Sequence, residues 1–221
     1  MTGALAAIVG QTARLSFRAG GGAFVGLVFY LAVVVAIPFA AGPDLKLLAR
    51  IGPAVLFIGA LLATLLNLDR LFREDHDDGG LDLLLLADVP AELMVLAKCA
   101  GAWLATALPL VVATPVLGLL LAVDAGPLAA ATAVLLVGTP ALTLIGAIGA
   151  ALATAVNRGG ILVAVLVLPF TIPVIIFGVS AAAAPNLTQG VPPFLILVAL
   201  TLASAVIAPI AGAAALKAGM N

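Results

Sequence analysis

Acidic side chains are concentrated in one short stretch of this chain of 221 residues, from Asp69 to Glu92. Eight of the ten Asp and Glu residues lie there against two arginines, which gives the stretch a net charge of −6. The only histidine, His76, stands between Asp75 and Asp77. Carboxylates and imidazole bind metals and transfer protons, so this stretch holds the residues that could do chemistry.

The spacing of these groups fits a metal site poorly. An EF-hand loop needs ligands at its first, third and fifth positions, a glycine at the sixth and a glutamate at the twelfth. With Gly79 as the sixth residue, His76 takes the third position, and with Gly80 as the sixth, Leu86 takes the twelfth. We therefore expect neither a metal site nor a directly bound cofactor, and we leave a role for His76 open.

Catalytic motifs are missing from the sequence. It contains no G-x-x-x-x-G-K-[ST] phosphate loop, so the chain does not bind a nucleotide in that way. It also contains no H-E-x-x-H motif and no histidine in any apolar stretch, which disfavours a membrane metalloprotease and a histidine-based catalytic dyad. We expect that the chain is not an enzyme by itself.

The elements around the acidic stretch are strongly apolar. Hydrophobic residues make up 65% of the chain, charged residues make up 9%, and the mean hydropathy is +1.36. Roughly 20 apolar residues cross a bilayer core of about 30 Å. This composition predicts one all-α transmembrane domain over residues 1–221. Six uncharged stretches have the length of a span: 23–41, 51–68, 99–123, 128–156, 160–184 and 194–216.

These six spans contain none of the readily ionised residues Asp, Glu, Lys, Arg and His. Transporters driven by protons keep an ionisable group at membrane depth, so that class is disfavoured, whereas coupling to Na⁺ held by backbone carbonyls is not excluded.

The orientation of the chain in the membrane follows from the short loops, because cytoplasmic loops are rich in Lys and Arg. Lys46 and Arg50 lie on one side, and seven cations lie on the other: Arg14, Arg18, Arg70, Arg73, Lys98, Arg158 and Lys217. Both termini and the acidic stretch are therefore expected in the cytoplasm.

An amphipathic helix is expected over residues 4–18, before the first span. Its apolar side chains fall on one face, and Arg14 and Arg18 fall on the other. This pattern is typical of a helix in the headgroup plane with its arginines near anionic lipid, although a simple positive-inside anchor explains it as well.

Prolines and glycines mark two further features of the spans. Pro169 and Pro173 are one turn apart and could form a bend needed for movement, or could be ordinary membrane-helix composition. Gly22 and Gly26 form a G-x-x-x-G pattern, which is consistent with close helix packing.

The acidic stretch itself predicts a helix break followed by a short apolar helix. HDDGG interrupts the helix that leaves the second span, and five leucines follow between Leu81 and Leu86. Pro90 and Glu92 mark the start of the next helix. The leucines either re-enter the membrane interface or insert into a partner, and the acids are either solubilising flanks or the edge of that contact. We favour a docking surface that passes movement of a cytoplasmic partner into the second and third spans.

Longer motifs point to a known family. The segments LDRLFREDHDDGGLDLLLL, ELMVLAKCAGAW, LPLVVATP, GTPALTLIGAIGAAL and NRGGILVAVLVLPFTIPVIIFG occur in this order, most densely between residues 47 and 178. Together they resemble CcmB, the haem exporter protein B family of permease subunits from the cytochrome c maturation ABC transporter. The resemblance implies an ABC-2-type permease in the bacterial inner membrane, with two permease copies in the complex and no nucleic-acid partner.

The resemblance also implies partners and contact residues. The expected partners are the ATPase subunit CcmA, which binds ATP, the haem-handling CcmC, the small CcmD and, indirectly, the haem chaperone CcmE. The cargo is haem, or else ATP hydrolysis releases haem-loaded CcmE from the complex. Alternatives are an ABC permease for another lipid or small molecule, a secondary transporter, and an assembly scaffold. The loop of residues 69–92 would carry the coupling helix, with these ATPase contacts: Arg73, Asp75, Asp78, Gly79, Leu81, Asp82 and Leu84.

Overall fold

The computed structural model describes residues 2–17, 22–42, 44–68, 70–86, 89–156, 161–184 and 187–219, and these residues form helices and their connections. The shorter helices are α1 (Thr2–Phe17), α4 (Arg70–Asp77), α5 (Gly80–Leu86) and α6 (Ala91–Ala102). The longer ones are α2 (Gly22–Ala41), α3 (Leu45–Leu68), α7 (Leu108–Leu120), α8 (Ala125–Ala155), α9 (Ile161–Ala182) and α10 (Leu187–Gly219).

Six helical segments are long and apolar enough to cross a membrane, which confirms the expected all-α fold with six transmembrane helices. The third of them begins at Ala91 rather than at residue 99, directly after Pro90 as the helix-start signals indicated. Lys98 therefore lies within this helix and not before it. The six segments are Gly22–Ala41, Leu45–Asp77, Ala91–Leu120, Ala125–Ala155, Val165–Ala182 and Thr188–Gly219.

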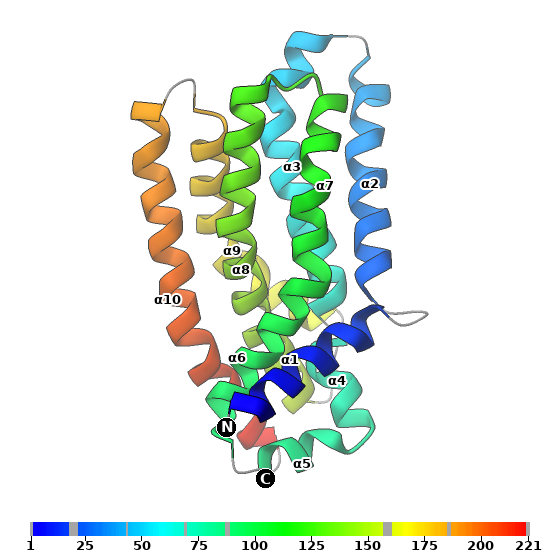
Figure 1. Ribbon diagram of the computed structural model, residues 1–221, viewed down its shortest axis with the longest axis vertical. Helices are drawn as coiled ribbons and strands as arrows, with labels where there is room; N and C mark the ends of the chain where they lie inside the picture. The colour runs from blue at the N-terminus through cyan, green and yellow to red at the C-terminus, as the bar shows by residue number, and fades with distance from the viewer. Residues whose placement is uncertain are drawn as a thin grey trace.

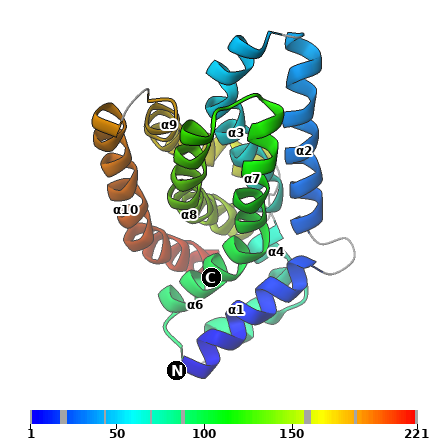
Figure 2. The ribbon, with the colours of Figure 1, turned by 45° about the horizontal axis from the view of Figure 1, so that its top comes forward.

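The long helices stand side by side as a bundle, and the short ones gather at one end of it (Figure 1). Both ends of the chain lie at that same end, together with α4 and α5. Turned forward, the molecule shows α1 crossing this end obliquely instead of extending the bundle (Figure 2). We call α4 and α5, residues 70–86, the hairpin, and this end of the bundle the hairpin end.

Close helix contacts are made where glycine faces a larger side chain. The buried Phe57 of α3 fits between Gly138 of α8 and Gly178 of α9. A Cβ atom on these glycines would stand only 2.8 and 2.5 Å from Phe57 Cζ, so neither position has room for a side chain. Phe57 thereby lets three helices approach one another, and the packing they gain is the main source of helix association in lipid.

The G-x-x-x-G pattern of α2 makes a close helix contact, and its partner is α3. A Cβ atom on Gly22 or on Gly26 would overlap the Asn67 side chain. Asn67 Nδ2 donates to the carbonyl oxygen of Ala63 at 3.2 Å, so its amide is satisfied within its own helix. Small residues on α2 therefore accommodate a polar side chain near the hairpin end.

Prolines in the spans affect the regularity of their helices in two different ways. A π-helical turn, Trp103–Ala107, joins α6 to α7, and the Leu108 N–H donates to the carbonyl of Trp103 five residues earlier. Pro109 follows at once and has no N–H to give, which favours the irregular turn here. By contrast, α9 continues as an α-helix through Pro169 and Pro173, and their role in a bend for movement stays a prediction.

Candidate functional site

The hairpin turns sharply at one glycine. Gly79 has a φ of 70°, in the left-handed region, and its N–H donates to the carbonyl oxygen of His76 at 3.1 Å. A residue with a Cβ is disfavoured in this conformation, whereas glycine adopts it freely. The HDDGG segment therefore breaks the helix after Asp77 and sends α5 in a new direction.

The inner face of the hairpin is packed into the protein. Leu71 and Phe72 of α4 and Leu81 of α5 are buried in one apolar cluster with Met94 of α6 and Leu144 of α8. Burial of a large apolar side chain away from water contributes about 1.5–3 kcal/mol. The hairpin is thus a packed part of the bundle end.

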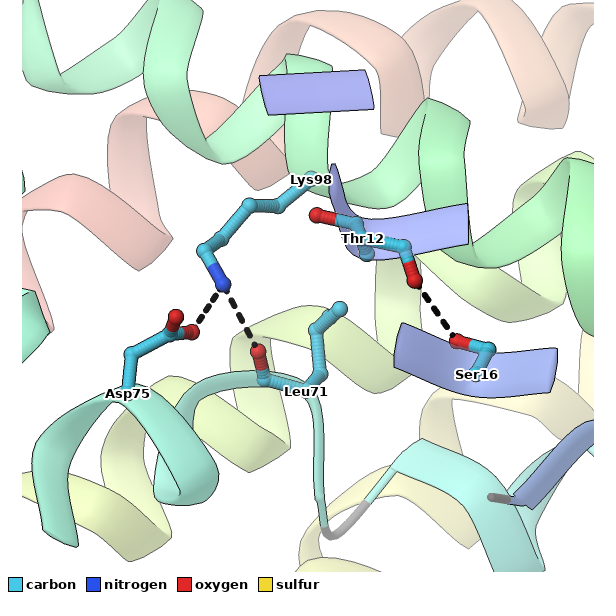
Figure 3. Close-up of polar contacts among 5 residues, drawn as sticks. All are labelled: Thr12, Ser16, Leu71, Asp75 and Lys98. Atoms are coloured by element: carbon cyan, nitrogen blue, oxygen red, sulfur yellow. Dashed lines mark hydrogen bonds and ion pairs between the residues drawn. The ribbon is translucent and has the colours of Figure 1, made fainter. Parts of the chain in front are cut away.

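A buried ion pair holds the hairpin to the third span. Lys98 Nζ of α6 donates to the carboxylate of Asp75 and, at 3.3 Å, to the carbonyl oxygen of Leu71 (Figure 3). Nζ also lies 5.8 Å from the centre of the Phe72 ring, within cation–π range. The Lys98 side chain is 5% exposed and that of Asp75 is 13% exposed. Little water screens this pair, so loss of either partner would leave a largely buried charge without its counterion.

A small polar cavity lies beside the ion pair. Its volume is about 50 Å³, room for a few water molecules. Helices α1, α3, α4 and α6 all contribute to its wall, which includes Gln11, Thr12, Asn67, Asp75 and Lys98. Polar groups of α1 and α3 therefore lie in the same cavity wall as the ion pair, and α1 forms one side of it.

Helix α1 crosses α6 one turn beyond Lys98. A Cβ atom on Gly101 would stand 2.7 Å from the carbonyl oxygen of Val9 and 2.8 Å from Thr12 Cβ, so only glycine allows this approach. The predicted apolar face of α1 therefore packs in part against the protein, while Arg14 on the other face is exposed. A position in the headgroup plane stays a prediction, and Arg18 lies outside the described residues.

The outer face of the hairpin carries exposed leucines. Leu83 is 73% exposed and Leu86 is 79% exposed, and both belong to α5. The contacts expected from the sequence were Leu81 and Leu84 and not these two leucines. In a helix with a 3.6-residue period, Leu83 and Leu86 lie on the side opposite to the buried Leu81. An apolar and acidic surface thus faces away from the bundle.

The predicted contact residues divide between the two faces of the hairpin. Arg73, Asp78 and Gly79 are exposed. Leu81 and Asp75 point inward, so in this conformation they support the hairpin instead of offering a surface, which differs from the expected contact role. Leu84 is half-buried, and the side chain of Asp82 lies outside the described part of the chain.

A second, exposed ion pair also joins α6 to another helix. Lys217 Nζ of α10 lies 3.4 Å from Glu92 Oε1, with the two side chains 54% and 43% exposed.

Among the described residues, no group of three or more His, Cys, Asp or Glu side chains is placed to hold a metal ion.

Six apolar helices with their charged side chains gathered largely at one end define a multi-pass membrane protein. The family model described as CcmB protein matches residues 3–219, and the chain belongs to this family. It is 55% identical to Heme exporter protein B of Bradyrhizobium diazoefficiens over 221 residues, which cover 99% of each chain. It is 42% identical to Heme exporter protein B of Rhodobacter capsulatus over 97% of this chain and 99% of that one. The Escherichia coli K12 protein of the same name is 45% identical over 92% of this chain and 93% of the relative.

Proposed function

We propose that this chain is the membrane permease component of a haem export system, and that its hairpin docks a separate ATP-binding subunit. The first part is supported by the CcmB family and by near full-length similarity to proteins named Heme exporter protein B. The second part rests on one observation, the pair of exposed leucines on a helix that turns away from the bundle. Neither part requires a nucleotide site in this chain.

The chemistry of the hairpin favours a protein partner over the membrane interface. Leu83 and Leu86 offer apolar area, but the exposed carboxylates of Asp77 and Asp78 lie just before α5. Moving carboxylates into the bilayer is costly, whereas a protein groove can bind the leucines while the acids stay at its hydrated rim. Arg73 and Asp78 would then contribute to recognition more than to affinity.

The proposed topology places the hairpin end in the cytoplasm of a bacterial inner membrane. Cytoplasmic ends of spans are rich in Lys and Arg, and the topology is supported by the cations on the helices that gather at that end, which are Arg14, Arg70, Arg73, Lys98 and Lys217. ATP is present in the same compartment, so an ATP-binding subunit could reach α5 there. The cargo is haem itself, or else the movement releases a haem-loaded chaperone from the complex.

Docking is tested by purifying the complex from native membranes in mild detergent. We expect a P-loop subunit to co-purify, and Leu83→Asp with Leu86→Asp to reduce its yield by about tenfold, because a carboxylate would enter the apolar contact. The control is Leu45→Asp, since Leu45 is an exposed leucine and is the first residue of α3, outside the hairpin. Co-purification that survives the two hairpin changes would contradict docking at this surface.

The haem assignment is tested separately by deleting the gene. Membranes of the deletion strain, stained for covalently bound haem, should have lost their c-type cytochromes and should regain them with the wild-type gene. Retained cytochromes would instead favour a permease for another lipid or small molecule, or a scaffold.

A further inference from the structure

One lysine holds a full turn of α4. Lys98 Nζ binds the carboxylate of Asp75 and the carbonyl oxygen of Leu71, and these residues are one helical turn apart. One bond goes to a side chain of α4 and the other to its backbone, so both the rotation and the translation of α4 are restrained. Apolar packing alone would not fix α4 in this way, because dispersion contacts are short-ranged and non-directional.

The same lysine belongs to a helix that crosses the membrane. Residues from Ala91 through the π-helical turn to Leu120 form the third span, and Lys98 lies one turn before that irregular turn. On the hairpin side, Leu81 of α5 packs in the same buried cluster as Phe72 of α4. A continuous series of contacts therefore runs from α5 through α4 to Lys98 of the third span.

The surroundings keep the ion pair strong. Helix α1 crosses α6 at Gly101 and forms one wall of the cavity beside Lys98 and Asp75. Because the two charged side chains are largely buried, the attraction between them is greater than at the surface. Arg70 and Glu74 also line this cavity, so the pair has charged neighbours of both signs.

We propose that Lys98 and Asp75 are positioning residues that fix the hairpin to the third span, so that movement imposed on α5 by a docked partner is transmitted into the membrane. The source of that movement rests on the proposed docking of an ATP-binding subunit. The rigid attachment itself is a property of this chain and can be measured without the partner.

Attachment is tested by hydrogen–deuterium exchange on the purified full chain in nanodiscs. Lys98→Met should speed exchange of the backbone amides of residues 70–86 by about tenfold, because local opening becomes easier, while exchange within α8 stays unchanged. Lys98→Arg keeps the charge and the donors and should retain most of the protection. Lys217→Met is the matched control, since it removes a lysine from the exposed pair.

If Lys98→Met does not insert, Asp75→Asn provides the second variant, because it removes the charge and keeps the shape of the side chain. Exchange as slow as in the wild type in these variants, or equal loosening in Lys98→Arg and Lys98→Met, would overturn the proposal.

Transmission is tested in the purified complex. Lys98→Met should retain a bound P-loop subunit, whose contact leucines are unchanged, yet lose most of the ATP hydrolysis that depends on this chain. Lys98→Arg should recover it, which a general folding defect would not predict. Full ATP hydrolysis by a variant with a loosened hairpin would refute transmission. Absence of the P-loop subunit from the wild-type complex would refute docking, but the result on attachment of the hairpin would still stand.

Discussion

Two lysine–carboxylate pairs join α6 to other helices, and they differ mainly in their surroundings. Lys98 and Asp75 are 5% and 13% exposed, whereas Lys217 and Glu92 are 54% and 43% exposed. The buried lysine gains a backbone carbonyl and an aromatic ring as further neighbours, while the exposed pair is a single contact of 3.4 Å. Water screens the second pair much more than the first, so the same chemistry restrains one helix and barely affects the other.

The largest expected effect is loss of one buried partner. Lys98→Met leaves the Asp75 carboxylate buried without its cation, so we expect the free energy of unfolding to fall by about 3 kcal/mol. Detergent-titrated unfolding of the purified chain measures it. The double change Lys98→Met with Asp75→Asn should cost less than Lys98→Met alone, because no uncompensated charge remains. Simple additivity of the two single changes would argue against a coupled pair.

A smaller effect is expected when the cover over the buried pair is displaced. Gly101→Leu places a side chain where Val9 and Thr12 now lie, so α1 must move away from α6 at a cost of about 1–3 kcal/mol. Cysteine labelling at Thr12→Cys, in a chain where Cys99 is replaced by serine, should become faster. The control is Gly10→Leu, because Gly10 has open space around it and should leave the labelling rate unchanged.

The turn of the hairpin is expected to be less sensitive. Gly79→Ala retains the fold but adds a Cβ at a φ of 70°, which costs about 1–2 kcal/mol. Thermal unfolding in detergent would detect the loss. Gly80→Ala is the comparison, since Gly80 has ordinary backbone geometry and space for a Cβ. Equal melting temperatures for the two variants would mean that the left-handed turn is not required.

The smallest effect is expected at the exposed pair. Lys217→Met should change the free energy of unfolding by about 0.5 kcal/mol or less, and the difference from wild type should shrink further in 0.5 M salt because exposed charges are screened. The same unfolding titration at low and high salt measures both values. A loss as large as that of Lys98→Met would remove the distinction between the two pairs.

Much of the fold could be predicted because it depends on local composition and period. The apolar stretches predicted six spans, Pro90 marked the start of α6, and HDDGG marked the helix break that the structure places at Gly79. The G-x-x-x-G of Gly22 and Gly26 indicated a close contact, but its partner Asn67 on α3 could not be identified from the pattern.

The hairpin could be predicted as a segment, but the orientation of its side chains could not, and its role as a contact site stays a prediction. The sequence drew attention to the leucines of α5, yet Leu81 is buried and Leu83 and Leu86 are the ones that face outward. Asp75 was expected at a surface and instead bonds to Lys98, 23 residues later in the chain. Nothing in local spacing reports such a pair, because it depends on how α4 folds back against α6.

By itself, the sequence determined that this chain lies in a membrane, where its helices begin and break, and which segment collects the acidic groups. Those properties follow from hydrophobicity, proline, glycine and charge, which act over a few residues. Only the tertiary structure decided which carboxylate is buried, which leucines remain exposed, and which lysine holds the hairpin. These outcomes depend on contacts between distant helices, where burial sets the strength of each charge and the availability of each side chain.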